Sequence, residues 1–219
     1  MIPDHAMHVL PCRGELRASV ILLHGYASRA SVHSEDGMAF VNDGTEVVMP
    51  DAPGHGSRDD GRLARIAELP DEPRRAAIHD IAREWIGELP GLVANCKQRG
   101  SKRIGLVGIS MGGFAALGAL APPCPFAAIA AVLAAPTLLE PTLHDPANVT
   151  PGQPPVLLGL AGQDTAVPPE PGRRFAEEYG AELHEYPESE HFMRGEDWHD
   201  LWNRTAAFLR RQLHRNLID

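Results

Sequence analysis

The sequence predicts an α/β fold with a mostly parallel sheet that carries helices on both faces. Short apolar runs alternate along the chain with segments whose apolar residues recur at helical spacing. The runs at 20–23 and 156–160 are apolar almost throughout, as is typical of strands buried on both faces. Such alternation favours right-handed crossovers between parallel strands, so functional residues are expected at the carboxyl ends of the strands.

The expected strands lie at 20–23, 45–49, 103–107, 127–133, 156–161 and 181–186. Helices are expected over 74–99, from residue 111 to 120, over 171–179 and over 200–213. Pro90 should kink or divide the first of these helices, because proline lacks an N–H and crowds the preceding turn. The segment 137–155 is rich in Pro, Thr, Asn and Gly. It predicts a short irregular insertion at the edge of the sheet where functional residues are expected, and no large cap domain.

Length and composition fit a single domain over residues 1–219, with 43% hydrophobic and 22% charged residues. A net charge of −9 argues against nucleic acid as a partner, because a nucleic-acid binder needs a basic face. The apolar runs fall short of the roughly 18 residues that cross a membrane. The beginning of the chain has no pattern of a signal peptide, so we expect a cytoplasmic protein without a membrane partner.

The three cysteines, Cys12, Cys96 and Cys124, are odd in number and widely spaced. They indicate neither a disulfide framework nor a zinc site, and we expect buried thiols. The histidines show no metal-ligand spacing, so no metal is expected.

Residues 108–112 read Gly-Ile-Ser-Met-Gly, a G-x-S-x-G motif between a predicted strand and a predicted helix. A serine on such a sharp turn projects from the backbone, and the flanking glycines leave room for the turn. The helix N-terminus directs free N–H groups toward the space above the serine, where they would stabilise an oxyanion. Ser110 is therefore the candidate nucleophile. The alternative is a glycine-rich turn with a buried serine.

A nucleophilic serine needs a base, and the base needs a carboxylate that orients it. Asp164 follows the strand at 156–161, and His191 follows the strand at 181–186. The order Ser, Asp, His is that of the α/β-hydrolases. His199 and Asp145 are the alternatives. We favour His191 and Asp164, because His199 adjoins the last helix and Asp145 lies in the insertion.

The chain thus resembles a compact α/β-hydrolase of the serine esterase type, nearest to the dienelactone-hydrolase-like and small bacterial esterase branch. The resemblance rests on His24-Gly25, the segment 51–56, the motif at 108–112, the segment 162–164 and His191. It implies that the backbone N–H groups of Tyr26 and Met111 hold the oxyanion, and that no cofactor is needed. His24 and His55 are expected to be structural. Dienelactone hydrolases proper have a cysteine where this chain has Ser110.

The expected activity is hydrolysis of carboxylic esters, or thioesters, of small or short-chain acyl groups through an acyl-enzyme. The substrate is expected to be a small molecule. An acyltransferase or perhydrolase would use the same three residues, and fold and motif do not separate these activities. A hydrolase-like binding protein without catalysis is the remaining alternative, although such proteins usually lack one of the three residues.

Overall fold

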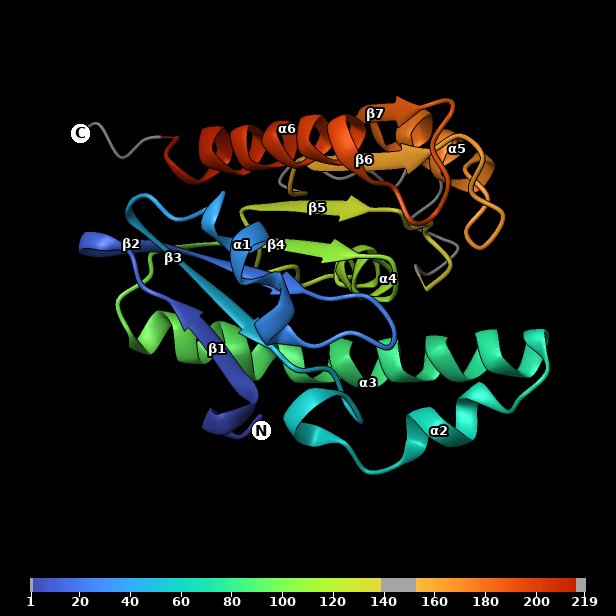
Figure 1. Ribbon diagram of the computed structural model, residues 1–219. Coiled ribbons are helices and arrows are strands. Elements are labelled where there is room, and N and C mark those ends of the chain that lie inside the picture. Colours follow the sequence, from blue (N-terminus) through green and yellow to red (C-terminus); the bar gives the residue numbers. More distant parts are fainter. Residues whose placement is uncertain (1, 139–152, 216–219) are drawn as a thin grey trace.

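The computed structural model describes residues 2–138 and 153–215 (Figure 1). Within these residues seven strands form one sheet in the order β1-β3-β2-β4-β5-β6-β7. β1 runs antiparallel to β3, and the other neighbouring pairs are parallel. The strands are β1 (Met7–Leu10), β2 (Arg13–Leu23), β3 (Asp43–Pro50), β4 (Arg103–Ile109), β5 (Ala128–Val132), β6 (Val156–Ala161) and β7 (Glu182–Tyr186).

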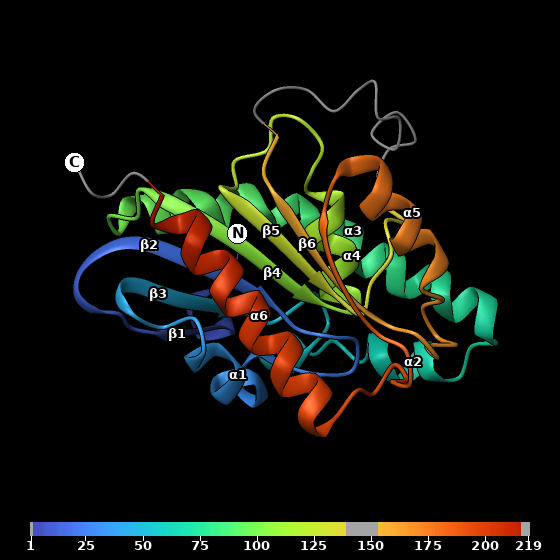
Figure 2. The same cartoon turned by 90° about the horizontal axis from the view of Figure 1, so that it is seen from above.

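Helices cover both faces of this sheet. The longer helices are α3 (Asp71–Gln98), α4 (Met111–Gly118), α5 (Glu170–Tyr179) and α6 (Gly195–Leu213). α3, α4 and α5 pack on one face, and α6 crosses the other face over the central strands (Figure 2). In β2, Ile21 and Leu23 belong to the first core, whereas Val20 and Leu22 belong to the second. Because side chains alternate along a strand, an apolar run serves both cores.

The predicted fold class is confirmed, and so are the existence and order of the predicted elements. The structure adds elements that the sequence analysis missed. They are β1, the early half of β2, three 3₁₀ turns (η1 at Asp4–Ala6, η2 at Ala30–His33 and η3 at Gly56–Arg58), α1 (Ser34–Met38) and α2 (Arg62–Ala67). These segments are short or largely exposed, so they carry no continuous apolar run.

The sequence predicts that Pro90 kinks or divides its helix. α3 continues through Pro90 as one helix, so the second of these alternatives is wrong. Trp85, Leu89, Leu92 and Val93 lie on both sides of Pro90 and are buried in the same core. Their packing outweighs the hydrogen bond that proline cannot donate.

Cys96 is buried, whereas Cys12 and Cys124 are only half-buried, so the expectation of three buried thiols is wrong for two of them. In the predicted insertion, the described residues 137–138 and 153–155 belong to no helix or strand. Residues 139–152, which include Asp145, lie outside the described residues. In the part of the chain that is described, no helix is long and apolar enough to cross a membrane.

Candidate active site

Ser110 occupies the single position between the end of β4 and the start of α4. Its backbone has φ 52° and ψ −112°, a conformation that costs a non-glycine residue energy. Two backbone hydrogen bonds hold the turn: the Ser110 N–H donates to Val132 O at 2.8 Å, and the Phe114 N–H donates to Ser110 O at 2.9 Å. The strand-to-helix turn predicted for the motif is therefore present.

Neighbouring glycines make this turn possible. A Cβ atom on Gly108 would collide with the backbone of Gly112, and a Cβ atom on Gly112 would collide with the backbone of Leu23. Strand and helix approach so closely here that only hydrogen atoms fit between them. The requirement for glycine at both ends of the motif is thus a requirement for space.

The structure brings Ser110, His191 and Asp164 into one chain of hydrogen bonds. Ser110 Oγ lies 2.9 Å from His191 Nε2, and His191 Nδ1 lies 2.6 Å from Asp164 Oδ2. Asp164 is 4% exposed, and its Oδ1 accepts hydrogen bonds from the N–H groups of Ala166 and Val167 at 2.9 and 2.7 Å. These two donors fix the carboxylate. The Nδ1–H of His191 then donates to Asp164 Oδ2, and Nε2 is left as the acceptor for the serine proton.

The loop that carries His191 is held at both ends. The Gln163 N–H donates to Ser189 O at 2.9 Å, which joins the loops after β6 and β7. On the other side of His191, Met193 is buried in the core under α6. His199, the alternative base, is exposed on α6. The other alternative, Asp145, lies outside the described residues.

Tyr26 and Met111, the predicted oxyanion donors, lie on the two segments next to Ser110. Met111 is the first residue of α4, so its N–H has no acceptor within the helix. Tyr26 follows Gly25, and a Cβ atom on Gly25 would lie 3.7 Å from Ser110 Cβ. Among the described residues, the Tyr26 N–H has no hydrogen-bond acceptor. Neither N–H group thus has an acceptor among the described residues.

His24 has a structural position, as the sequence predicts. It is buried, donates from Nδ1–H to Gly25 O at 2.8 Å, and accepts at Nε2 from the Ala52 N–H at 3.0 Å. Burial lowers the pKa of His24 from 6.5 to about 4, since the charged ring would lose its hydration. A neutral His24 thus links the loop after β2 to the loop after β3.

His55 makes a second link of the same kind. Its Nε2 accepts from the Ala27 N–H at 3.2 Å, and its Nδ1–H donates to Pro53 O at 2.9 Å. Burial lowers the pKa of His55 as well, so the ring stays neutral and keeps an acceptor nitrogen. Ala27 has φ 56°, an uncommon value for a residue with a side chain. The sequence analysis missed this strained residue, which no motif signals.

Asp51 completes the support of this region. Its Oδ1 accepts from the Ala30 N–H at 2.8 Å, and its Oδ2 accepts from the Ser57 N–H and hydroxyl at 2.9 and 2.8 Å. Burial alone would raise the pKa of Asp51, but these hydrogen bonds hold it below the usual value. Asp51 therefore holds the backbone of two loops by accepting hydrogen bonds from their N–H groups. Among the described residues, no group of His, Cys, Asp and Glu side chains is arranged to hold a metal ion.

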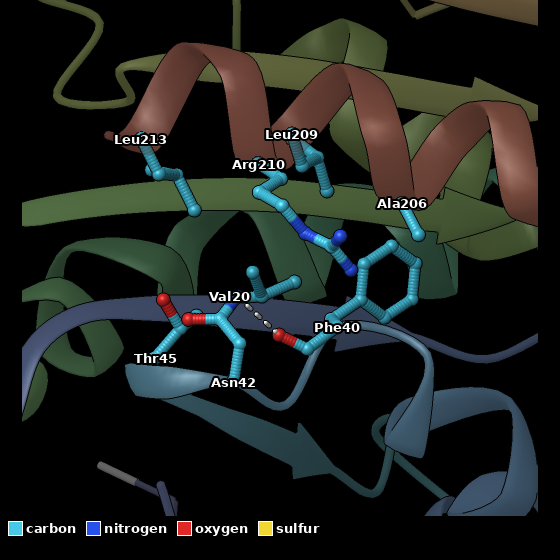
Figure 3. Close-up of a pocket in the computed structure, with 8 residues that line it drawn as sticks. All are labelled: Val20, Phe40, Asn42, Thr45, Ala206, Leu209, Arg210 and Leu213. Atoms are coloured by element: carbon cyan, nitrogen blue, oxygen red, sulfur yellow. Dashed lines mark hydrogen bonds between the residues drawn. The ribbon is translucent and has the colours of Figure 1, made fainter. Parts of the chain in front are cut away.

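Two cavities lie away from Ser110. One of about 10 Å³ opens between β2, the start of β3 and α6, with room for about one water molecule (Figure 3). The other, of about 430 Å³, lies beyond the carboxyl end of β3. Its lining includes His5, His8, Arg29, Ser31, Asp51 and Ser57. Neither is lined by Ser110, His191 or Asp164.

A serine on the turn after a central parallel strand, followed by an acid and a histidine after two later strands, is the arrangement of the α/β-hydrolase class. Residues 20–217 match the alpha/beta hydrolase family, so the chain belongs to this family and the predicted resemblance to it is confirmed. The esterase YjfP of Escherichia coli strain K12 is 34% identical over 112 residues. That stretch is 50% of this chain and only 39% of the relative's own length.

Solved structures agree in fold. Esterase PE8 has a TM-score of 0.68 and 24% identity, and the match covers 94% of this chain and 98% of that one. TT1662 from Thermus thermophilus has a TM-score of 0.70 and 18% identity, with 96% and 94% of the two chains covered. At this level of identity the two structures establish the fold and nothing beyond it.

Proposed function

We propose that this protein is a serine esterase that cleaves carboxylic esters through an acyl-enzyme. The observation that carries the proposal is the hydrogen-bonded chain from Ser110 Oγ through His191 to Asp164. Family membership and the likeness to an Escherichia coli esterase support it. A binding protein without catalysis would have no need of this chain beside two free N–H groups.

The proposed reaction begins with attack of Ser110 Oγ on the ester carbonyl. His191 Nε2 takes the serine proton, and Asp164 stabilises the imidazolium that results. The N–H groups of Tyr26 and Met111 donate to the oxyanion of the tetrahedral intermediate. His191 then returns the proton to the departing alcohol, which leaves an acyl-enzyme. Water, deprotonated by His191, attacks the acyl carbon, and the acid leaves as the proton passes back to Ser110.

The proposed substrates are small molecules with short acyl groups, as esters or thioesters. This finer proposal rests on the shortness and proline content of the segment 137–155 in the sequence, which leaves little chain to cover a long acyl group. A series of nitrophenyl esters from acetyl to palmitoyl tests it. We expect kcat/KM to fall as the acyl chain grows. A steady rise toward palmitoyl would contradict the proposal.

A fluorophosphonate probe tests the nucleophile itself. We expect it to label Ser110 in the wild-type protein and to leave Ser110→Ala unlabelled, with kcat lowered by several orders of magnitude. Ser31→Ala is the matched control, because Ser31 is exposed and its hydroxyl makes no hydrogen bond to the described residues. This variant should keep full activity. If folded Ser110→Ala keeps more than a few per cent of activity, Ser110 is not the nucleophile.

Product analysis separates hydrolysis from acyl transfer. We expect the free acid as the main product, both alone and with an added alcohol, thiol, amine or peroxide. If the acceptor takes most of the acyl group at low concentration, the protein is an acyltransferase or perhydrolase that uses the same serine.

A further inference from the structure

Phe192, the residue after the proposed base, is the most exposed of the large apolar side chains in the described chain, at 81%. Val32 and Met38 follow at 56% and 55%. Single exposed apolar residues are common and need no explanation by themselves. Phe192 differs because its ring lies against the ring of His191, with centroids 5.5 Å apart and planes at 83°.

The exposure of Phe192 is not the result of a loose loop. On one side of it, His191 is held by Ser110 and Asp164, and on the other side Met193 is buried in the core. Earlier in the loop, the Ser189 hydroxyl donates to Asp197 Oδ2 at 2.6 Å. The fold thus holds both neighbours of Phe192 and presents its ring to solvent.

The role of His191 as the base indicates which part of a substrate would lie near the Phe192 ring. In the proposed reaction His191 Nε2 hands its proton to the departing alcohol oxygen, so the alcohol portion lies on the side of the imidazole. Phe192 contacts that imidazole edge to face. An apolar ring in this position can pack against the alcohol portion of the ester, whereas the carbonyl oxygen faces the oxyanion donors.

The charged residues near Phe192 in the sequence also disfavour a leaving group with a negative charge. The exposed or half-exposed acids of this segment are Glu188, Glu190, Glu196 and Asp197, whereas its cationic side chain is Arg194. The chain as a whole carries a net charge of −9. An anionic leaving group would therefore be repelled as it approached His191.

We propose that Phe192 forms a leaving-group subsite that selects esters of uncharged aromatic alcohols. The inference rests on the proposed esterase function and names the half of the substrate that the catalytic residues leave open. Phe192 is a specificity residue that contacts the substrate and takes no part in proton transfer.

Benzyl acetate and ethyl acetate test the subsite, because both form the same acetyl-enzyme and both release an alcohol of similar acidity. Phe192→Ala should lower kcat/KM for benzyl acetate roughly tenfold and leave ethyl acetate within about twofold of wild type. Phe192→Trp keeps an aromatic face and should restore most of the preference. Met38→Ala, which removes an exposed apolar side chain on α1, should change neither ester.

Charge is tested with the acetate ester of 4-(hydroxymethyl)benzoate, which adds a carboxylate to the benzyl group. We expect a lower kcat/KM than for benzyl acetate, and the difference should shrink as salt is added. The subsite is overturned if Phe192→Ala leaves the ratio of kcat/KM for benzyl acetate to that for ethyl acetate unchanged. It is also overturned if fluorophosphonate labels the wild-type protein but the protein does not hydrolyse benzyl acetate. A wild type whose Ser110 does not label overturns the esterase proposal instead.

Discussion

The Nε2 atom of His55 accepts a hydrogen bond from the N–H of Ala27, 28 residues earlier in the chain. Ala27 has positive φ and directly follows Tyr26, whose N–H we propose as an oxyanion donor. The strained backbone at Ala27 persists because a buried neutral histidine holds it. The geometry of the proposed oxyanion site therefore depends on a loop that carries none of the proposed catalytic residues.

His55→Ala should lower kcat roughly ten- to a hundredfold with a small change in KM. Loss of one oxyanion donor costs about a hundred- to a thousandfold, and a displaced donor should cost somewhat less. Steady-state kinetics on one short-chain ester measures the effect, with Tm as the check on folding. A large rise in KM at constant kcat would mean that His55 supports substrate binding and not the oxyanion.

The protein should lose stability as the pH falls through the range from 6.5 to about 4. The pKa of His24 is lowered to about 4 in the folded protein, against 6.5 unfolded, so in this range only the unfolded chain takes up the proton. The part of the free energy of unfolding that depends on His24 is fully present above pH 6.5. It is lost as the pH falls from 6.5 to about 4, and the total loss is about 3 kcal/mol.

Urea unfolding at a series of pH values measures this loss, with His24→Asn as the comparison. The Asn amide can keep the donation that His24 Nδ1–H makes to Gly25 O but does not titrate, so the variant should be less sensitive to acid over this range. Equal slopes in the two proteins would show that other groups carry the acid sensitivity. His55, whose pKa is also lowered by burial, is the first of those groups to examine.

Asp164→Asn should leave the fold intact and lower kcat by about four orders of magnitude. The amide can turn its NH₂ group toward His191 Nδ1, which would stabilise the wrong tautomer and remove the proton acceptor at Nε2. Kinetics and circular dichroism on the purified variant test this. Asp145→Asn is the control and should behave as wild type. The reverse result would make Asp145 the orienting acid.

The sequence predicts the residues of this site that lie at the ends of strands, but not the contacts between its loops. Ser110 and Asp164 each follow an apolar run, His191 follows the last predicted strand, and parallel strands bring such positions to one edge of the sheet. The contact between His55 and Ala27 joins two loops of irregular backbone. No periodicity encodes it, so it emerges only when both loops are packed.

In the fold, too, buried elements were predictable from the sequence and exposed ones were not. Core strands such as β4 and β6 were predictable because burial on both faces demands continuous apolar residues. β1 is a four-residue edge strand with no fully buried residue, and α1 has only Gly37 buried, so neither leaves a pattern in the sequence. The effect of Pro90 depends on the packing of residues around it, which local propensity does not describe.

Alanine should have opposite effects at two glycines. Gly108→Ala should cost at least about 3 kcal/mol or prevent folding, because the added methyl group would meet the backbone of Gly112 and backbone cannot yield as a side chain does. Gly91→Ala should stabilise the protein by about 1 kcal/mol. Gly91 lies exposed within α3, nothing lies within 4 Å of its added Cβ atom, and alanine has the higher helix propensity.

Urea unfolding of the two variants beside wild type decides both expectations, and unchanged m-values would show that the same two states are compared. A Gly108→Ala variant of wild-type stability would mean that the turn at Ser110 can widen, and the close approach of β4 and α4 would no longer explain the glycine. If Gly91→Ala gives no gain, the backbone after Pro90 departs from regular helix. The stability of α3 would then rest on its buried side chains alone, among them Trp85 and Leu92.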